Sequence, residues 1–133
     1  MLFGPEHVAR YRATDGEEGH DWQGTQCLIL TTTGATSGAQ RDAPLIYGQD
    51  GDKLIVVASK GGAPDHPAWY KNLRANPGVE VQVRGDRFAA TARDATSQER
   101  PGLWSLMTKE WPAYDEYQQK TERQIPLVVL ERA

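Results

Sequence analysis

A short polar and glycine-rich stretch near the middle of the chain has residue types that bind ligands. Ser59, Lys60, Gly61 and Gly62 follow the apolar run LIVV at residues 54–57, after the single residue Ala58. A hydroxyl, a mobile ammonium and bare backbone N–H groups suit an anion or a polar heterocycle lying across a strand end. A strand, a glycine turn and a helix without any ligand is the alternative interpretation of the same residues.

A second group with chemical potential is aromatic. Trp111, Tyr114 and Tyr117 are spaced by three residues, which places them near one side of a helical turn. Phenol groups beside a planar ring can both stack on it and donate a hydrogen bond. Core packing is the alternative interpretation of this spacing.

The sequence lacks the motifs of hydrolytic, metal-dependent and phosphate-binding sites. It contains no Ser-His-Asp pattern, paired acidic motif, His-Glu-x-x-His, Cys-His cluster or phosphate-binding loop. We therefore expect no metal site, and we expect a bound cofactor to supply any chemistry. The single cysteine, Cys27, reads as a small core residue. His7 and His20 lack metal-ligand spacing and are expected to be solvated.

Length and charge restrict the class of protein. The 133 residues suffice for one domain, with residues 1–24 as a weakly patterned N-terminal arm, anchored by Trp22, and 25–133 as the domain itself. Fifteen basic against 18 acidic residues give a formal charge of −3, which offers no electrostatic case for a nucleic-acid partner. No run of 18 apolar residues and no cleavable leader is visible, so we expect no integral membrane segment and a cytoplasmic protein.

Hydrophobic patterning indicates the elements that position both candidate groups. It predicts strands near residues 25–33, 42–47, 54–57, 79–83, 87–94 and 127–130, and helices near 5–13, 67–76, 96–110 and 114–121. Val79, Val81 and Val83 share one strand face, so the opposite face is expected to be wet. Short links without crossover helices favour antiparallel pairing. The expected fold is α+β but mainly β, with about six strands closing a small barrel or strongly coiled sheet.

Two longer stretches resemble a known family. TTTGATSGAQRDAPLIYGQDGDKLIVVASKGGAPDHPAWYKNLRANPGVEVQV and WPAYDEYQQKTERQIPLVVLE, within Cys27 to Glu131, resemble the deazaflavin-dependent nitroreductases, which use coenzyme F-420. The resemblance implies a split β-barrel related to the FMN-binding barrels. It also implies an oxidoreductase, in which the reduced deazaflavin passes a hydride from its C5 carbon to a quinone or nitroaromatic acceptor.

The resemblance also implies residue roles. Arg41 and Lys60 would contact the coenzyme's phosphate or oligoglutamate tail. Ala58 and Ser59 would lie against the ring, where Gly61 and Gly62 allow close approach. Trp111, Tyr114 and Tyr117 would lie beside the acceptor, and the candidate catalytic groups are the hydroxyl-bearing side chains, namely Ser59, Tyr114 and Tyr117. Packing and helix-surface roles are expected for Trp69 and Asn72.

Two departures from the family pattern leave alternatives open. Ala35 and Thr36 stand where the family commonly has an Arg-Lys pair, which favours weaker or different binding of the tail, or an FMN- or FAD-dependent barrel. Trp111 stands where many relatives have tyrosine, which affects nitro-drug activation more than quinone reduction. A noncatalytic deazaflavin or haem carrier is a further alternative. Monomer and homodimer both remain open, and a lipid quinone acceptor would bring the protein to a membrane surface.

Overall fold

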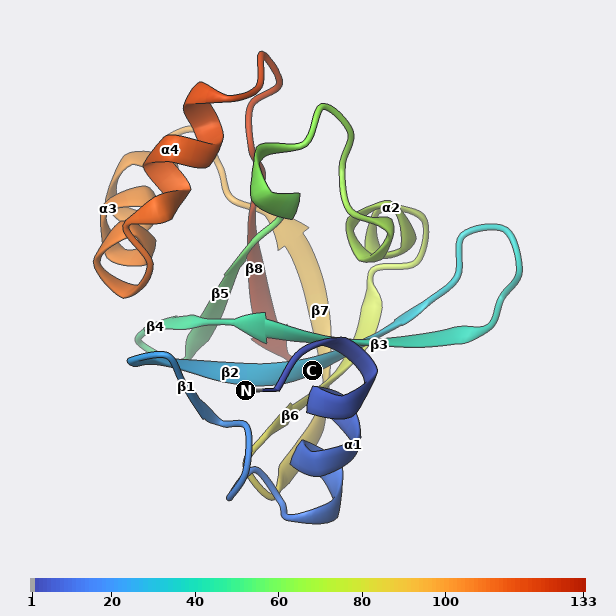
Figure 1. The fold of residues 1–133 in the computed structure, drawn as a ribbon. Helices are drawn as coiled ribbons and strands as arrows, with labels where there is room; N and C mark the ends of the chain where they lie inside the picture. Colours follow the sequence, from blue (N-terminus) through green and yellow to red (C-terminus); the bar gives the residue numbers. More distant parts are fainter. Residues whose placement is uncertain (1) are drawn as a thin grey trace.

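Antiparallel strands form the frame of the molecule, which a computed structural model describes for residues 2–133 (Figure 1). All of the strand pairs in this part of the chain are antiparallel. The strands are β1 (Asp21–Trp22), β2 (Thr25–Thr33), β3 (Gln40–Ile46), β4 (Gly48–Asp50), β5 (Lys53–Val57), β6 (Gly78–Val83), β7 (Asp86–Asp94) and β8 (Leu127–Arg132).

The strand ladders form a ring. β2 pairs with β3, and β3 is separated from β4 by the single residue Tyr47. β4 pairs with β5, and the ladders continue through β8, β7 and β6 back to β2. Because β3 and β4 act as one bent strand, the ring has about six principal strands. The prediction of a mainly β split barrel is confirmed.

Burial on both faces explains the uninterrupted apolar sequence of β5. Leu54 and Val56 belong to the barrel interior, whereas Ile55 and Val57 pack against two helices on the outer face. These helices are α3 (Arg100–Glu110) and α4 (Ala113–Gln119). A strand that is buried on both sides has no polar alternation. The glycine-rich turn follows this strand, with Lys60 and Gly61 exposed.

The glycine-rich turn is a short helical segment, and a further helix follows it. The 3₁₀ segment η1 (Lys60–Gly62) follows β5, and α2 (Ala68–Ala75) packs on the barrel interior through Tyr70 and Leu73. In Figure 1, η1 lies between α4 and α2.

The predicted helix near residues 96–110 corresponds to α3. Reciprocal bonds between Thr96 and Glu99, in the pattern of a capping box, lie just before it.

The N-terminal arm packs closely on the sheet. Helix α1 (Gly4–Ala13) buries Tyr11 completely, and Arg12 donates a 2.7 Å hydrogen bond to the side chain of Gln82. Gln82 is only 2% exposed, so the prediction of a wet face on β6 is wrong where α1 covers it. The prediction of solvated histidines is also wrong, since His7 is 2% and His20 6% exposed.

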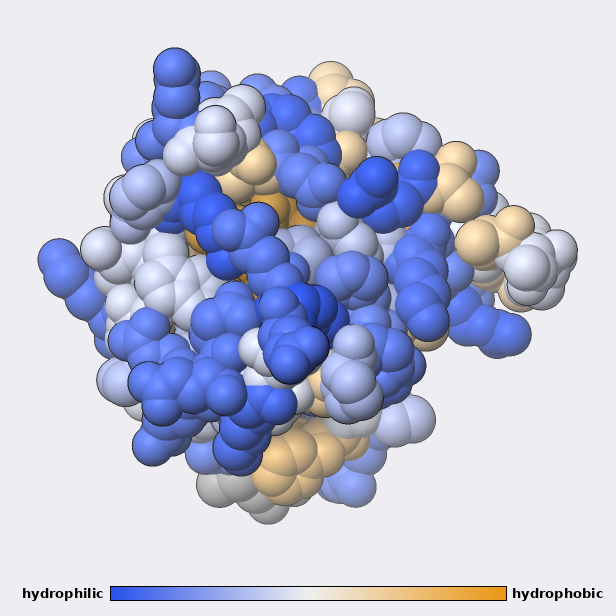
Figure 2. Space-filling view, turned by 90° about the horizontal axis from the view of Figure 1, so that it is seen from above, coloured by the Kyte–Doolittle hydropathy of each residue, from blue (hydrophilic) through white to orange (hydrophobic). Residues whose placement is uncertain are grey.

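Two properties of the remaining surface bear on partners. Among residues 2–133, no helix is both long and apolar enough to cross a bilayer. The face seen in Figure 2 is largely hydrophilic, with small apolar areas. Phe3 is the one large hydrophobic side chain exposed in the described chain, at 61%.

Candidate functional site

A cavity of about 400 Å³ lies at the exit of β5. It is lined by the turn after β5, the end of β3, the start of α2, the α3–α4 connection with α4, and the N-terminal arm. It brings together six of the nine predicted site residues: Ser59, Lys60, Gly61, Trp111, Tyr114 and Tyr117. The two groups singled out from sequence therefore face one space.

The turn on one side of the cavity has an unusual backbone. Lys60, Gly61 and Gly62 have positive φ angles of 46°, 64° and 85°. Arg123 holds this turn from behind, because its guanidinium donates to the carbonyls of Ser59 at 2.7 Å and Ala63 at 2.8 Å. The two glycines adopt this conformation readily, but Lys60 has a Cβ and is strained in it without such support. Sequence analysis missed Arg123, which belongs to no local pattern.

The two glycines of the turn have different roles. A Cβ on Gly61 would meet no atom within 4 Å, so a ligand can approach its backbone. A Cβ on Gly62 would lie 2.6 Å from the Tyr117 carbonyl oxygen, so this glycine lets α4 approach the turn. Gly62 does not line the cavity. Ala58 also lies outside the lining and is fully buried, with its N–H donated to the carbonyl of Pro126.

The cations expected to meet an anionic tail are separated from each other. Lys60 lines the cavity and pairs with Asp65 at 3.1 Å, and its ammonium lowers the pKa of that carboxyl. Arg41 is exposed on β3 and does not line the cavity. The structure thus places only Lys60 of this pair at the candidate site.

The aromatic side of the cavity offers hydroxyl groups of two kinds. The Trp111 indole N–H points to the Tyr117 hydroxyl at 3.3 Å. Tyr114 is only 5% exposed, and within residues 2–133 its hydroxyl takes part in no side-chain hydrogen bond. Since no fully buried side-chain oxygen there lacks a partner, this hydroxyl keeps some accessible surface. Burial raises the pKa of Tyr114 well above its ordinary value. Tyr114 therefore offers a protonated hydroxyl that a ligand can use.

Trp69 and Asn72 have closer links to the site than the sequence suggests. Trp69 lines the cavity and also packs on the barrel interior. Asn72 is 9% exposed, so the helix-surface expectation is wrong. Its amide oxygen accepts the Ala35 N–H at 3.0 Å, and its amide nitrogen donates to Thr32 at 3.2 Å. Asn72 thereby fixes the loop that carries Ala35 and Thr36.

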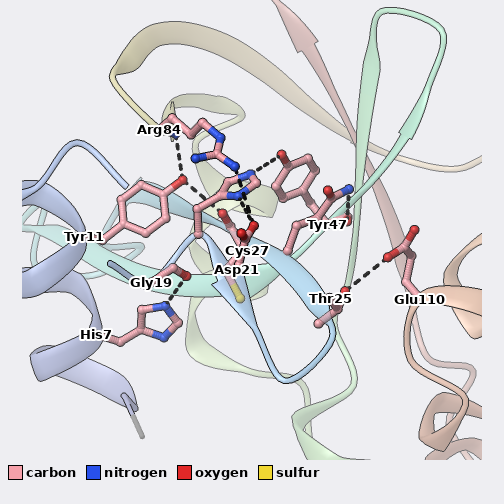
Figure 3. A network of polar contacts seen from close by, with 11 residues as sticks. His7, Tyr11, Gly19, Asp21, Thr25, Cys27, Tyr47, Arg84 and Glu110 are labelled. Carbon is pink, nitrogen blue, oxygen red and sulfur yellow. Dashed lines mark hydrogen bonds and ion pairs between the residues drawn. The ribbon is translucent and has the colours of Figure 1, made fainter. Parts of the chain in front are cut away.

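The N-terminal arm supplies a wall of the cavity through residues that the sequence did not single out as site residues. Phe3, His7 and Trp22 line the cavity, and the Trp22 ring lies 5.8 Å from that of Trp111. Figure 3 shows His7 and Tyr11 projecting from α1 toward the segment that contains Gly19 and Cys27. Their burial depends on contacts that are distant in sequence, so no local periodicity signals it.

A larger cleft of about 860 Å³ lies elsewhere, between α3, α4 and the end of β7. Its lining includes none of the predicted site residues, and its charges are mixed, with Asp94 and Glu122 beside Arg100. The smaller cavity is therefore the candidate site, because it joins a supported backbone turn to available hydroxyl groups.

Comparison with known proteins identifies the family of the chain. The family model described as F420H(2)-dependent quinone reductase matches residues 4–132. The chain belongs to this family. An F420H(2)-dependent quinone reductase of Mycobacterium tuberculosis H37Rv is 43% identical over 130 residues, covering 95% of this chain and 87% of the relative.

Solved structures of similar chains share the fold. The structure of an F420-H2 dependent reductase, FDR-A, is 44% identical and superposes with a TM-score of 0.73, covering 79% of this chain and 93% of that chain. A chain described as a domain-swapped dimer is 39% identical, with a TM-score of 0.76, and the match covers 96% of this chain and 100% of that one.

Proposed function

We propose that the protein is an oxidoreductase that uses reduced coenzyme F-420 to reduce quinones. The observation that carries this proposal is the cavity itself, where the Ser59–Gly61 turn faces Tyr114, in a chain of the quinone reductase family. The curated relative at 43% identity is named for this activity. Nitroaromatic compounds are a second acceptor class, which the replacement of a tyrosine by Trp111 makes less favourable.

The residues present fit a planar deazaflavin ring. The cavity volume of about 400 Å³ is within the range of small-molecule sites. The open backbone at Gly61 and the ring of Trp69 provide a surface on which a flat heterocycle can lie. When bound in its reduced form, the coenzyme supplies a hydride from its C5 carbon.

The side chains around that ring bind and polarise the acceptor. The hydroxyls of Ser59 and Tyr114 donate hydrogen bonds to an acceptor oxygen, whose negative charge grows as the hydride arrives. Tyr117 keeps Trp111 in place through their shared hydrogen bond. Trp22 and Trp111 close this side against water, which strengthens the electrostatic contacts within.

Contacts with the coenzyme's tail are proposed at the cavity rim. Lys60 is the nearest cation, and Arg41 on β3 meets a more distant part of the tail. Gly62 and Ala58 support the turn rather than touch the coenzyme, since neither lines the cavity. In this proposal, residues 1–24 are an arm that closes the cavity of the domain formed by residues 25–133.

A homodimer is proposed as the assembly. A 39% identical chain is described as a domain-swapped dimer and is matched over its whole length. Sedimentation of the purified protein at several concentrations tests this, and a single species with the mass of one chain would refute it.

Fluorescence titration with oxidised F-420, with FMN in parallel at the same salt concentration, tests the cofactor. Tight binding of F-420 and weak binding of FMN are expected. Anaerobic oxidation of reduced F-420 by a dimethyl-1,4-benzoquinone then tests the reaction. Preferential FMN binding would point to a flavin-dependent barrel, and F-420 binding without turnover on any quinone or nitroaromatic would identify a carrier.

A further inference from the structure

His7 has an environment that its expected role as a surface residue does not explain. It lies on α1, is 2% exposed and lines the same cavity as Tyr114. Its ring lies 6.1 Å from the Trp22 ring at an interplanar angle of 26°. A Cβ on Gly19 would lie 2.9 Å from the His7 ring, so only glycine fits beside it. The imidazole is thus held in one position at the cavity wall.

The hydrogen bond of His7 determines which nitrogen is available to a ligand. Nε2 lies 2.8 Å from the Gly19 carbonyl oxygen (Figure 3). A carbonyl only accepts, so Nε2 carries a proton and donates it. Nδ1 has no partner among residues 2–133, where every fully buried side-chain nitrogen or oxygen has one. Nδ1 therefore keeps some accessible surface, and His7 lines the cavity.

The reduction of a quinone needs a proton that the other cavity groups supply poorly. Hydride transfer to a quinone gives a hydroquinone monoanion, which must gain one proton. Tyr114 can donate a hydrogen bond, but burial raises the pKa of its phenol and makes it a weak acid. Lys60 is exposed and paired with Asp65 at 3.1 Å. Neither group is well suited to give up a proton inside the cavity.

We propose that His7 is the acid of the acceptor half-reaction and that it protonates the reduced quinone through Nδ1. The inference rests on the proposed function. The hydride carries two electrons to the quinone, and the Nδ1–H bond of the imidazolium breaks as the oxygen–hydrogen bond of the hydroquinone forms. The Nε2 proton stays on His7 throughout, in its hydrogen bond to the Gly19 carbonyl. Solvent returns a proton to Nδ1 after the product leaves.

Three buried side chains near His7 are uncharged near neutral pH. Tyr11 on the same helix and Cys27 on β2 are both uncharged near neutral pH, because burial raises each pKa to about 12. Tyr114 of α4 is uncharged for the same reason. In the neighbouring loop, Glu18 pairs with Arg10 at 3.1 Å.

Replacing His7 with glutamine tests the proposal. The amide nitrogen of the introduced glutamine can still donate to Gly19, but the side chain offers no acid. We expect His7→Gln to lower kcat for a dimethyl-1,4-benzoquinone about 100-fold, at the lower end of general acid catalysis, with F-420 affinity unchanged. The native rate should fall toward alkaline pH, as expected for a step that needs a proton donor. The variant should lack this fall, and added imidazole should partly restore the rate of His7→Ala.

A control and a binding measurement separate chemistry from packing. Tyr11→Phe removes a 3.0 Å bond from the arm to the Cys27 carbonyl but lies outside the cavity lining, so it should keep the native pH profile. In ¹⁵N NMR with oxidised F-420 present, 2,6-dimethylphenol should shift His7 Nδ1, to which its hydroxyl donates. The proposal would be overturned if His7→Gln kept the native kcat and pH profile. It would also be overturned if Tyr11→Phe lowered kcat as much as His7→Gln does. If the native protein oxidises no reduced F-420, the proposed function fails, and the absence of a phenol-induced shift would independently reject the His7 contact.

Discussion

The guanidinium of Arg123 donates a 2.7 Å hydrogen bond to the carbonyl of Ser59. The same group donates to the carbonyls of Ala58 and Ala63, at 3.2 Å and 2.8 Å. One side chain from the segment before β8 therefore sets the backbone of the cavity turn. Since this turn presents Ser59 and Gly61 to a ligand, Arg123 acts on the site without lining it.

Arg123→Met is expected to destabilise the protein by about 2–4 kcal/mol. The variant leaves the carbonyls of a partly buried turn without their charged donor. Affinity for F-420 should fall as well, because the turn loses its support. Urea unfolding and fluorescence titration measure the two effects. Arg87→Met, which breaks an exposed pair with Glu80, should change stability by less than about 1 kcal/mol.

Substitution of the two neighbouring glycines, Gly61 and Gly62, should affect stability and F-420 affinity differently. Gly62→Ala should cost about 3 kcal/mol, because the residue has a φ of 85° and its Cβ would overlap the Tyr117 carbonyl. Gly61→Ala should cost only about 1 kcal/mol, since its Cβ meets open space. Its methyl group should instead weaken F-420 binding about tenfold. Equal losses of affinity and stability in both variants would contradict these separate roles.

Tyr114→Phe tests the available hydroxyl. We expect kcat for quinone to fall about tenfold, as one hydrogen bond to the charged acceptor oxygen is lost. Stability should change little, because this hydroxyl has no partner within residues 2–133. Tyr117→Phe should affect kcat less, since its oxygen already lies 3.3 Å from the Trp111 nitrogen. Steady-state kinetics and thermal unfolding of both variants provide the comparison.

Glu99 should make stability depend on acid pH. Its hydrogen bond with Arg93 lowers its pKa from 4.5 to about 2. A carboxyl whose pKa is lower in the folded state stabilises the protein above its unfolded pKa, and this contribution is lost as the pH falls toward 2. Urea midpoints measured from about pH 6 down to about pH 2.5 should therefore fall less steeply for Glu99→Gln than for the native protein. Exposed Glu17→Gln is the control and should follow the native curve.

Restoring the family's basic pair should tighten coenzyme binding. In Ala35→Arg/Thr36→Lys, two added cations can meet the phosphate or the oligoglutamate tail, on a loop that Asn72 holds through the Ala35 N–H. We expect F-420 affinity to rise about tenfold at low salt and the gain to shrink as salt increases. An unchanged affinity would show that the tail takes a path away from this loop.

Local patterns were sufficient to predict the elements that carry the cavity. The run at residues 54–57 lies within β5, and the spacing of Trp111, Tyr114 and Tyr117 brings all three to one space. Strong periodicity and turn residues act over a few positions, so one sequence reveals them. The resemblance then supplied what patterning cannot, namely which ligand suits such a turn.

The remaining parts of the site depend on contacts that are distant in sequence. The burial of His7 follows from the docking of α1 on the sheet, and Gln82 is buried because Arg12 reaches it from 70 residues away. Arg123 reaches Ser59 across 64 residues. No amphipathic pattern marks these pairs, because each consists of polar groups that become buried only when the barrel closes.

The separation of these partners along the sequence limits the order in which their contacts can form. Tyr11 must wait for Arg84, 73 residues later in the sequence, whose N–H its hydroxyl accepts. The turn at Ser59 must likewise wait for Arg123 near the end of the chain. Contacts of such long range form late in folding. The protein thus acquires its cavity only when nearly the whole chain has been made, and a nascent chain that still lacks β8 has nowhere to hold its coenzyme.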